Sequence, residues 1–150
     1  MFMTGVALAT PVRVLAFSDG AHEIVAPLDD GEAVTYSYRQ SIYDVLVYED
    51  FVRHGGAIDL QRVRSPDIRS VEYFRWEDRR ILQGADGLWY EDAPPPTAHD
   101  ELVLRIAPLG QQRWTTARWT LDLLPRFGET VVTVRVQERP RVVALLEAPR

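Results

Sequence analysis

Residues 34–65 constrain the fold most strongly, because this stretch divides into strand-like runs separated by turn signals. Three runs in it are rich in β-branched and aromatic residues, which favour extended backbone: residues 34–38, 42–53 and 57–64. Gly55 and Gly56 separate the last two runs and suit a hairpin turn that needs positive φ. Residues 39–41 interrupt the pattern, so we expect a β-bulge there or a corner where the chain passes between sheets.

Strand patterns continue on both sides of this stretch. Apolar side chains alternate in three later runs, each of which predicts a strand with one buried face: residues 102–106, 119–123 and 132–136. Further strands are predicted at residues 12–17, 23–27 and 142–146, and short hairpin turns at Asp19-Gly20 and Asp86-Gly87. Residues 68–76 match neither period well, and we favour a bulged strand there over a single helical turn near Pro66.

These runs together predict an all-β protein of about ten short strands. The expected architecture is a single-domain antiparallel β-sandwich, immunoglobulin-like, or a partly open barrel. With 150 residues, of which 46% are hydrophobic, the chain is long enough to bury one core of its own. We expect this domain to span residues 12–150.

Two interpretations of residues 1–11 stay open. The segment is apolar, with small residues, and lacks a basic flank. It is either a loose N-terminal arm leading into the first strand or the remnant of a signal peptide or membrane anchor. The first interpretation keeps the protein in the cytoplasm, and the second exports it.

The composition argues against several partners and cofactors. The net charge of −5 leaves no basic excess to neutralise phosphates, which argues against nucleic acid and anionic membrane surfaces. The sequence has no cysteine, so disulfides and thiolate metal ligands are excluded. The three histidines, His22, His54 and His99, are not at metal-ligand spacing from one another. We therefore expect no metal and no cofactor.

Catalytic motifs are also missing from the sequence. There is no Gly-x-Ser-x-Gly motif, and paired acids such as Glu49-Asp50 are neighbours on a strand, which point to opposite faces. We therefore expect that the protein is not an enzyme and that it has no catalytic residue. Glu49 stands on an otherwise apolar strand face, where an unpaired carboxylate is costly. We expect it near the strand end, in contact with solvent or an arginine.

Three spaced motifs resemble a known family. They are Tyr38-Arg39-Gln40-Ser41-Ile42, then Glu49-Asp50-Phe51, then Gly55-Gly56 before an apolar strand. This pattern is similar to the domain of unknown function family 1850, small proteins beside or fused to TRAP-type (tripartite ATP-independent periplasmic) transporters of the TAXI subtype. Gln40 stands where the family has a histidine, and a glutamine cannot titrate near neutral pH.

The resemblance implies a non-enzymatic accessory domain of a TRAP-type solute transporter. Its partner would be a membrane subunit or the solute-binding protein, and its location extracytoplasmic or membrane-associated. The alternative is a free-standing β-sandwich that binds a carbohydrate or small ligand through exposed tryptophans among the four in the chain. The candidate ligand or partner contacts surround the polar interruption after Tyr38: Tyr38, Gln40, Ser41, Tyr43, Glu49 and Tyr73.

Overall fold

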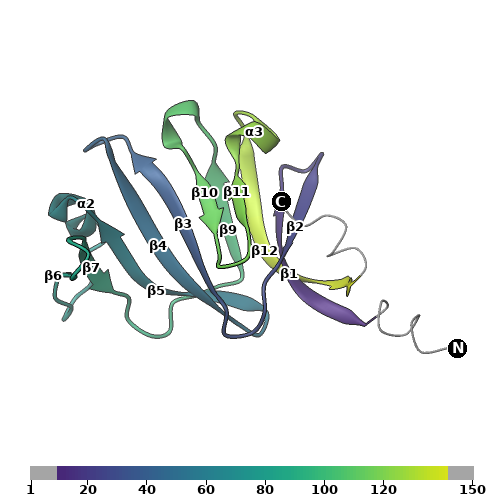
Figure 1. Cartoon of the computed structure of the whole chain (residues 1–150), viewed down its shortest axis with the longest axis horizontal. Coiled ribbons are helices and arrows are strands. Elements are labelled where there is room, and N and C mark those ends of the chain that lie inside the picture. The colour runs from purple at the N-terminus through teal and green to yellow at the C-terminus, as the bar shows by residue number, and fades with distance from the viewer. Residues whose placement is uncertain (1–9, 142–150) are drawn as a thin grey trace, which may run out of the picture.

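The computed structural model describes residues 10–141, whose strands form two antiparallel sheets (Figure 1). This confirms the all-β fold. The strand predicted at residues 142–146 and most of the N-terminal segment lie outside the described residues.

The smaller sheet has four strands, and the first and last strands of the described chain are neighbours in it. Its order is β2 (Glu23–Pro27), β1 (Pro11–Ser18), β12 (Val131–Pro140) and β9 (Glu101–Arg105). The longest pairing runs between β1 and β12, from Pro11 opposite Pro140 to Ser18 opposite Thr133. The alternation predicted at residues 132–136 is confirmed, because Val132 and Val134 are buried in the core.

The larger sheet has eight strands. Its main order is β11 (Thr120–Asp122), β10 (Arg113–Thr115), β3 (Ala33–Gln40), β4 (Val45–His54), β5 (Ala57–Ser65), β7 (Trp89–Asp92) and β6 (Leu82–Gln83), and β8 (Ala98–His99) also pairs with β5. Figure 1 shows that this sheet extends well past the smaller one, toward β6, β7 and the short helix α2 (Ile68–Glu72). We call the face that packs on the smaller sheet the inner face, and the opposite one the outer face.

Trp114 on β10 lies at the centre of the core between the sheets. It is fully buried, and its ring centroid is 5.7 Å from that of Phe17, which belongs to β1 of the smaller sheet. The rings of Tyr36 and Phe51 stack on it at 5.1 and 5.8 Å. Aromatic pairs contribute about 0.5–1.5 kcal/mol each beyond the area they bury, so this cluster is a main contact between the sheets.

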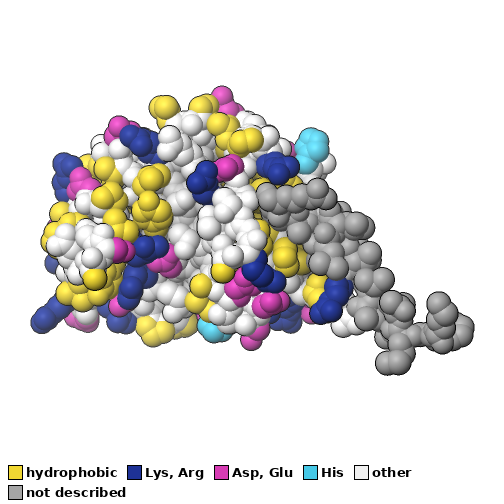
Figure 2. Space-filling model, in the orientation of Figure 1, with side chains coloured by type: hydrophobic (Ala, Val, Ile, Leu, Met, Phe, Trp, Pro, Cys, Tyr) yellow, Lys and Arg dark blue, Asp and Glu magenta, His cyan; other side chains and the backbone are white. Residues whose placement is uncertain are grey.

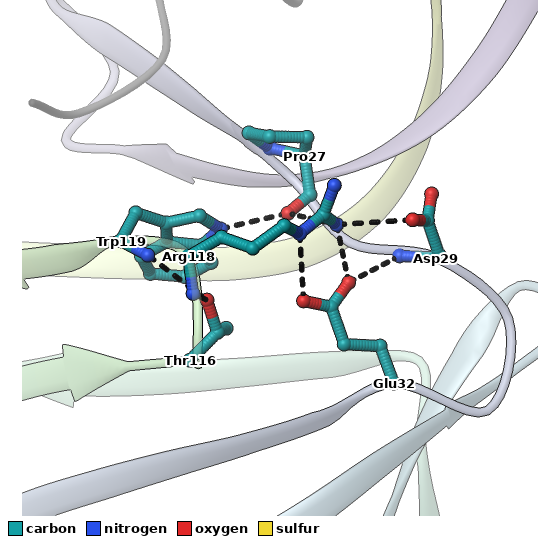
Figure 3. Close-up of polar contacts among 6 residues, drawn as sticks. All are labelled: Pro27, Asp29, Glu32, Thr116, Arg118 and Trp119. Atoms are coloured by element: carbon teal, nitrogen blue, oxygen red, sulfur yellow. Dashed lines mark hydrogen bonds and ion pairs between the residues drawn. The ribbon is translucent and has the colours of Figure 1, made fainter.

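An ion network fixes the crossing from the smaller to the larger sheet (Figure 3). Arg118, in the turn between β10 and β11, binds both carboxylate oxygens of Glu32, with 2.9 Å from Nε to Oε1, and lies 3.2 Å from Asp29. The neighbouring Trp119 donates from Nε1 to the Pro27 carbonyl at 2.7 Å. The loop between β2 and β3 is therefore tied to the β10–β11 hairpin.

The prediction of a β-bulge or a corner at residues 39–41 is wrong. β3 continues to Gln40, which pairs with Val45, so β3 and β4 are neighbours in one sheet. A turn at residues 41–44 joins them, closed by a 2.9 Å bond from the Asp44 amide to the Gln40 carbonyl. Asp44 has a φ of +56°, which aspartate tolerates better than most residues. The strand predicted from Ile42 therefore starts at Val45, and the register irregularity of β4 falls between Asp50 and Phe51.

The bulged strand predicted at residues 68–76 is also wrong, because the chain forms α2 there. The Asp67 carboxylate accepts a 2.9 Å bond from the Arg69 amide and caps the start of the helix. Ser70 and Val71 turn toward the sheet and are buried. A helix of five residues completes little more than one turn, which is too short to produce a visible 3.6-residue period.

Candidate functional site

The residues predicted from sequence lie around the end of β3, the 41–44 turn and α2. The structure brings Tyr38 and Glu49 together, since the Tyr38 hydroxyl hydrogen-bonds the Glu49 carboxylate, and Tyr73 makes a small contribution to the raised pKa of Tyr38. The Arg69 guanidinium sits 4.7 Å from the ring centroid of Tyr43, on the α2 side of the turn.

The other two polar candidates, Gln40 and Ser41, do not join this group. Ser41 is exposed in the turn, whereas Gln40 is buried on the inner face. The Gln40 carbonyl oxygen Oε1 has no hydrogen-bond partner within the described residues.

Glu49 lies in the middle of β4 and not at its end, which corrects our expectation. It faces inward, opposite Tyr36 on β3 and Val63 on β5. Its contact is the Tyr38 hydroxyl, and it makes no ion pair with an arginine among residues 10–141. Burial raises the pKa of the Glu49 carboxyl to about 6, partly offset by the Tyr38 hydrogen bond. Burial also raises the pKa of both tyrosines, with the Glu49 charge adding to the effect.

A second carboxylate, Glu91, stands on the same face, on the far side of Val63. It is fully buried, and its Oε1 accepts a 3.2 Å bond from the Trp76 amide. A solute in solvent does not reach this carboxylate without rearrangement. Glu49 and Glu91 therefore do not present a pair of carboxylates to a bound substrate.

The outer face of the larger sheet is also hollowed. A groove of about 480 Å³ crosses β3, β4, β10 and β11 there, within the size range of ligand pockets. Its floor is formed by side chains of the strands: Thr35, Ser37, Leu46, Tyr48, Arg113 and Thr115. Its walls come from the turn around η1 (Pro108–Gly110) and from the short helix α3 (Leu124–Phe127), which caps the upper end of β11 in Figure 1: Pro108, Gln111, Gln112, Leu124 and Pro125.

The charges at this groove are paired with one another. Arg113 donates from Nε to Asp122 at 2.6 Å, and from Nη2 to the other carboxylate oxygen at 3.2 Å. Next to the groove, Arg64 binds Asp50 with bonds of 2.6 and 2.9 Å, and Thr35 donates to the same carboxylate at 2.7 Å. Figure 2 shows basic and acidic side chains intermixed over the visible surface, with no broad field of one sign. The groove therefore offers a neutral lining.

Two glutamines in the groove wall have unusual environments. Gln111 has a φ of +48° and a ψ of +38°, a left-handed conformation that is uncommon outside glycine. Gln112 is 8% exposed and donates from Nε2 to the Arg105 carbonyl at 3.0 Å. Its Oε1 has no partner among the described residues. Strained backbone and unpaired buried polar groups concentrate at binding sites, so both observations point to this wall.

The site residues predicted on β3 and β4 are each one position away from a residue that lines the groove. The predicted residues Tyr38 and Glu49 face inward, whereas their neighbours Ser37 and Tyr48 point to the outer face. The sequence shows the alternation but not which polar face is hollowed. The hollow depends on β10 pairing with β3, in which Arg113 lies opposite Ser37 across a long separation in the chain.

The tryptophans do not form the exposed face that the carbohydrate hypothesis required. Trp114 is fully buried and Trp119 is 6% exposed, while Trp76 packs against the core. None of the exposed large hydrophobic side chains among residues 10–141 is a tryptophan.

Within residues 10–141, no group of three or more histidine, aspartate or glutamate side chains is placed to hold a metal ion. In the same range, no helix has the length and hydrophobicity needed to cross a membrane.

Comparisons with known proteins give no match. No family model matches the chain, and neither the curated proteins nor the solved structures include a significant match. The fold and the groove define a β-sandwich with a hollowed outer sheet face, and the resemblance to family 1850 stays a prediction.

Proposed function

We propose that this chain is a non-enzymatic binding domain whose ligand site is the groove on the outer face of the larger sheet. The observation that carries the proposal is the groove itself, about 480 Å³ in volume and walled by η1 and α3. Small-molecule sites have this size and combine apolar side chains with a few fixed polar groups. Leu46, Tyr48 and Leu124 supply the apolar surface, and Gln112 supplies an amide held in place by Arg105.

The charged groups of the groove support binding and not catalysis. The Asp122 carboxylate is held by Arg113, and the Asp50 carboxylate beside the groove by Arg64 and Thr35. A general base must be free to turn toward the substrate and take its proton, whereas both carboxylates are held in place by bonds from the protein. They are better suited to fix the shape of the floor.

The test is a ligand-observed NMR screen with a stated panel: glucose, mannose, glucuronate, glycerol, phenol and N-acetylated amino-acid amides. Ser37→Trp places an indole in the middle of the floor, and Gln61→Trp places one on the exposed part of β5, outside the groove. We expect saturation transfer to at least one compound with the unmodified protein and with Gln61→Trp, and at least tenfold weaker binding with Ser37→Trp. Transfer that is absent throughout, or unchanged in Ser37→Trp, would contradict the proposal.

A second function is favoured by an apolar surface at the far end of the larger sheet. Hydrophobic side chains gather over α2, β6 and β7 (yellow, at the left of Figure 2), and Tyr73 and Leu82 are 67% and 48% exposed. Exposed apolar patches often mark protein contacts. We propose this end as the contact for the TRAP-type transporter subunit that the resemblance to family 1850 implies.

Co-purification tests the partner function separately from the ligand groove. In mild detergent, a transporter subunit should be recovered with the unmodified protein and lost with Tyr73→Ser combined with Leu82→Ser. Leu109→Ser is the matched control, because Leu109 is 81% exposed in η1 and away from α2. Failure to recover any transporter subunit with the unmodified protein would count against the partner function.

A further inference from the structure

We infer that the groove binds a neutral, hydroxyl-rich ring, as found in one residue of an uncharged oligosaccharide; this inference rests on the proposed binding function of the same groove. Three properties of the lining lead to it: compensated charge, hydroxyl and amide groups on the floor and walls, and one aromatic ring among aliphatic side chains.

Charge compensation selects against ionic ligands. Arg113 is the basic residue of the lining, and its two hydrogen bonds go to Asp122, the acidic residue of the lining. An anionic ligand that contacts this guanidinium also meets the negative charge of Asp122 beside it, and a cationic ligand that contacts Asp122 meets the positive charge of Arg113. A neutral ligand binds without breaking the ion pair, and it can add hydrogen bonds to the outer oxygens and nitrogens of the pair.

Hydroxyl and amide groups favour a ligand that both donates and accepts. Ser37 and Thr115 lie on the floor, and in the described structure their hydroxyls donate to no protein group. Gln111 brings an exposed amide to the wall next to Gln112. Each of these groups can pair with an alcohol, because a hydroxyl is both a donor and an acceptor. A ligand with apolar groups alone would leave them unpaired.

Tyr48 provides the surface for the apolar face of such a ring. Its side chain lies on the floor beside Ser37, directly across the strand pair. The Arg64 guanidinium, 5.2 Å from the ring centroid, contacts Tyr48 from the neighbouring strand and holds it in position. A sugar ring has polar edges and C–H groups on its faces, so it suits an aromatic floor bordered by hydroxyls and amides.

Titration by calorimetry or NMR with three classes of probe tests the inference. The neutral probes are cellotetraose, maltotetraose, xylotetraose and mannotetraose; the charged probe is trigalacturonate; the apolar probes are phenol and cyclohexanol. We expect one neutral oligosaccharide to bind, with at least tenfold loss in Tyr48→Ala and little change in Tyr48→Phe, which keeps the ring. Ser37→Trp gives a second measurement of site loss if Tyr48→Ala does not fold, and Gln61→Trp is the control.

The outcomes separate the inference from the function on which it rests. Binding by trigalacturonate or the apolar probes alone, abolished by Ser37→Trp, would overturn the neutral-ring inference and leave the binding function in place. Neutral oligosaccharide binding that Ser37→Trp does not weaken would also overturn it. No binding by any probe in this panel or the NMR panel would overturn both.

Discussion

The Tyr38 hydroxyl donates a hydrogen bond to the Glu49 carboxylate across the β3–β4 pair, on the face of the sheet that packs inward. Burial raises the pKa of Glu49 from 4.5 to about 6, so folding favours the protonated acid. The contribution of the protonated Glu49 to the free energy of unfolding is fully present below pH 4.5, the pKa of the unfolded chain. It is lost as the pH rises through about 6, the pKa in the fold. This difference corresponds to about 2 kcal/mol at neutral pH.

Glu49→Gln should therefore raise the free energy of unfolding by about 1–2 kcal/mol at pH 7.5 and change it little at pH 4.5, because glutamine is neutral at both. Urea unfolding at the two pH values measures the difference. Comparing the variant with the unmodified protein cancels contributions from other acids such as Asp67, whose pKa is lowered mainly by Arg69. An equal effect at both pH values would show that burial of the Glu49 charge is not the cause.

The Arg118 network predicts energetic coupling between two distant loops. Arg118→Met leaves the largely buried Glu32 carboxylate without its guanidinium, so we expect a loss of about 1–2 kcal/mol. A double-mutant cycle with Glu32→Gln should give a coupling energy of roughly 1 kcal/mol, toward the upper end for exposed pairs. A coupling energy near zero would mean that the network does not stabilise the crossing between the sheets.

Trp114 should dominate the stability of the core. Trp114→Ala removes the ring that touches Phe17 of the opposite sheet, and we expect a loss of about 3–5 kcal/mol or failure to fold. Leu109→Ala, at an 81% exposed position, should change stability by less than about 0.5 kcal/mol. Thermal unfolding followed by circular dichroism compares the two. Similar effects of both substitutions would contradict the position of Trp114 in the core.

The helix cap of α2 gives a smaller effect. Asp67→Ala removes the acceptor of the Arg69 amide and should cost about 1 kcal/mol, whereas Asp67→Asn keeps an acceptor oxygen and should cost less. Urea unfolding distinguishes the two variants. Equal losses would show that the charge pair with Arg69, and not the cap, is the main contribution of Asp67.

The alternation of apolar and polar residues predicts the fold better than it predicts the position of the site. The strand that contains Val132 and Val134 can be predicted because every second side chain in it is buried. This pattern is visible in a few consecutive residues. α2 depends on one cap at Asp67 followed by five residues, so its period does not show. The groove depends on the non-local pairing of Arg113 with Ser37 and on the position of the η1 turn, neither of which is encoded in a local pattern.

The most direct test of the central claim, that the outer groove is the binding site, is a map of backbone amide shifts over the whole chain. The protein is titrated with the compound that gives the strongest transfer in the NMR screen. We predict that the largest shifts cluster at Ser37, Tyr48 and Gln112, with little change at Tyr38 and Tyr73. Shifts centred on Tyr38, Tyr73 and α2 instead would contradict the account and move the site to the inner face.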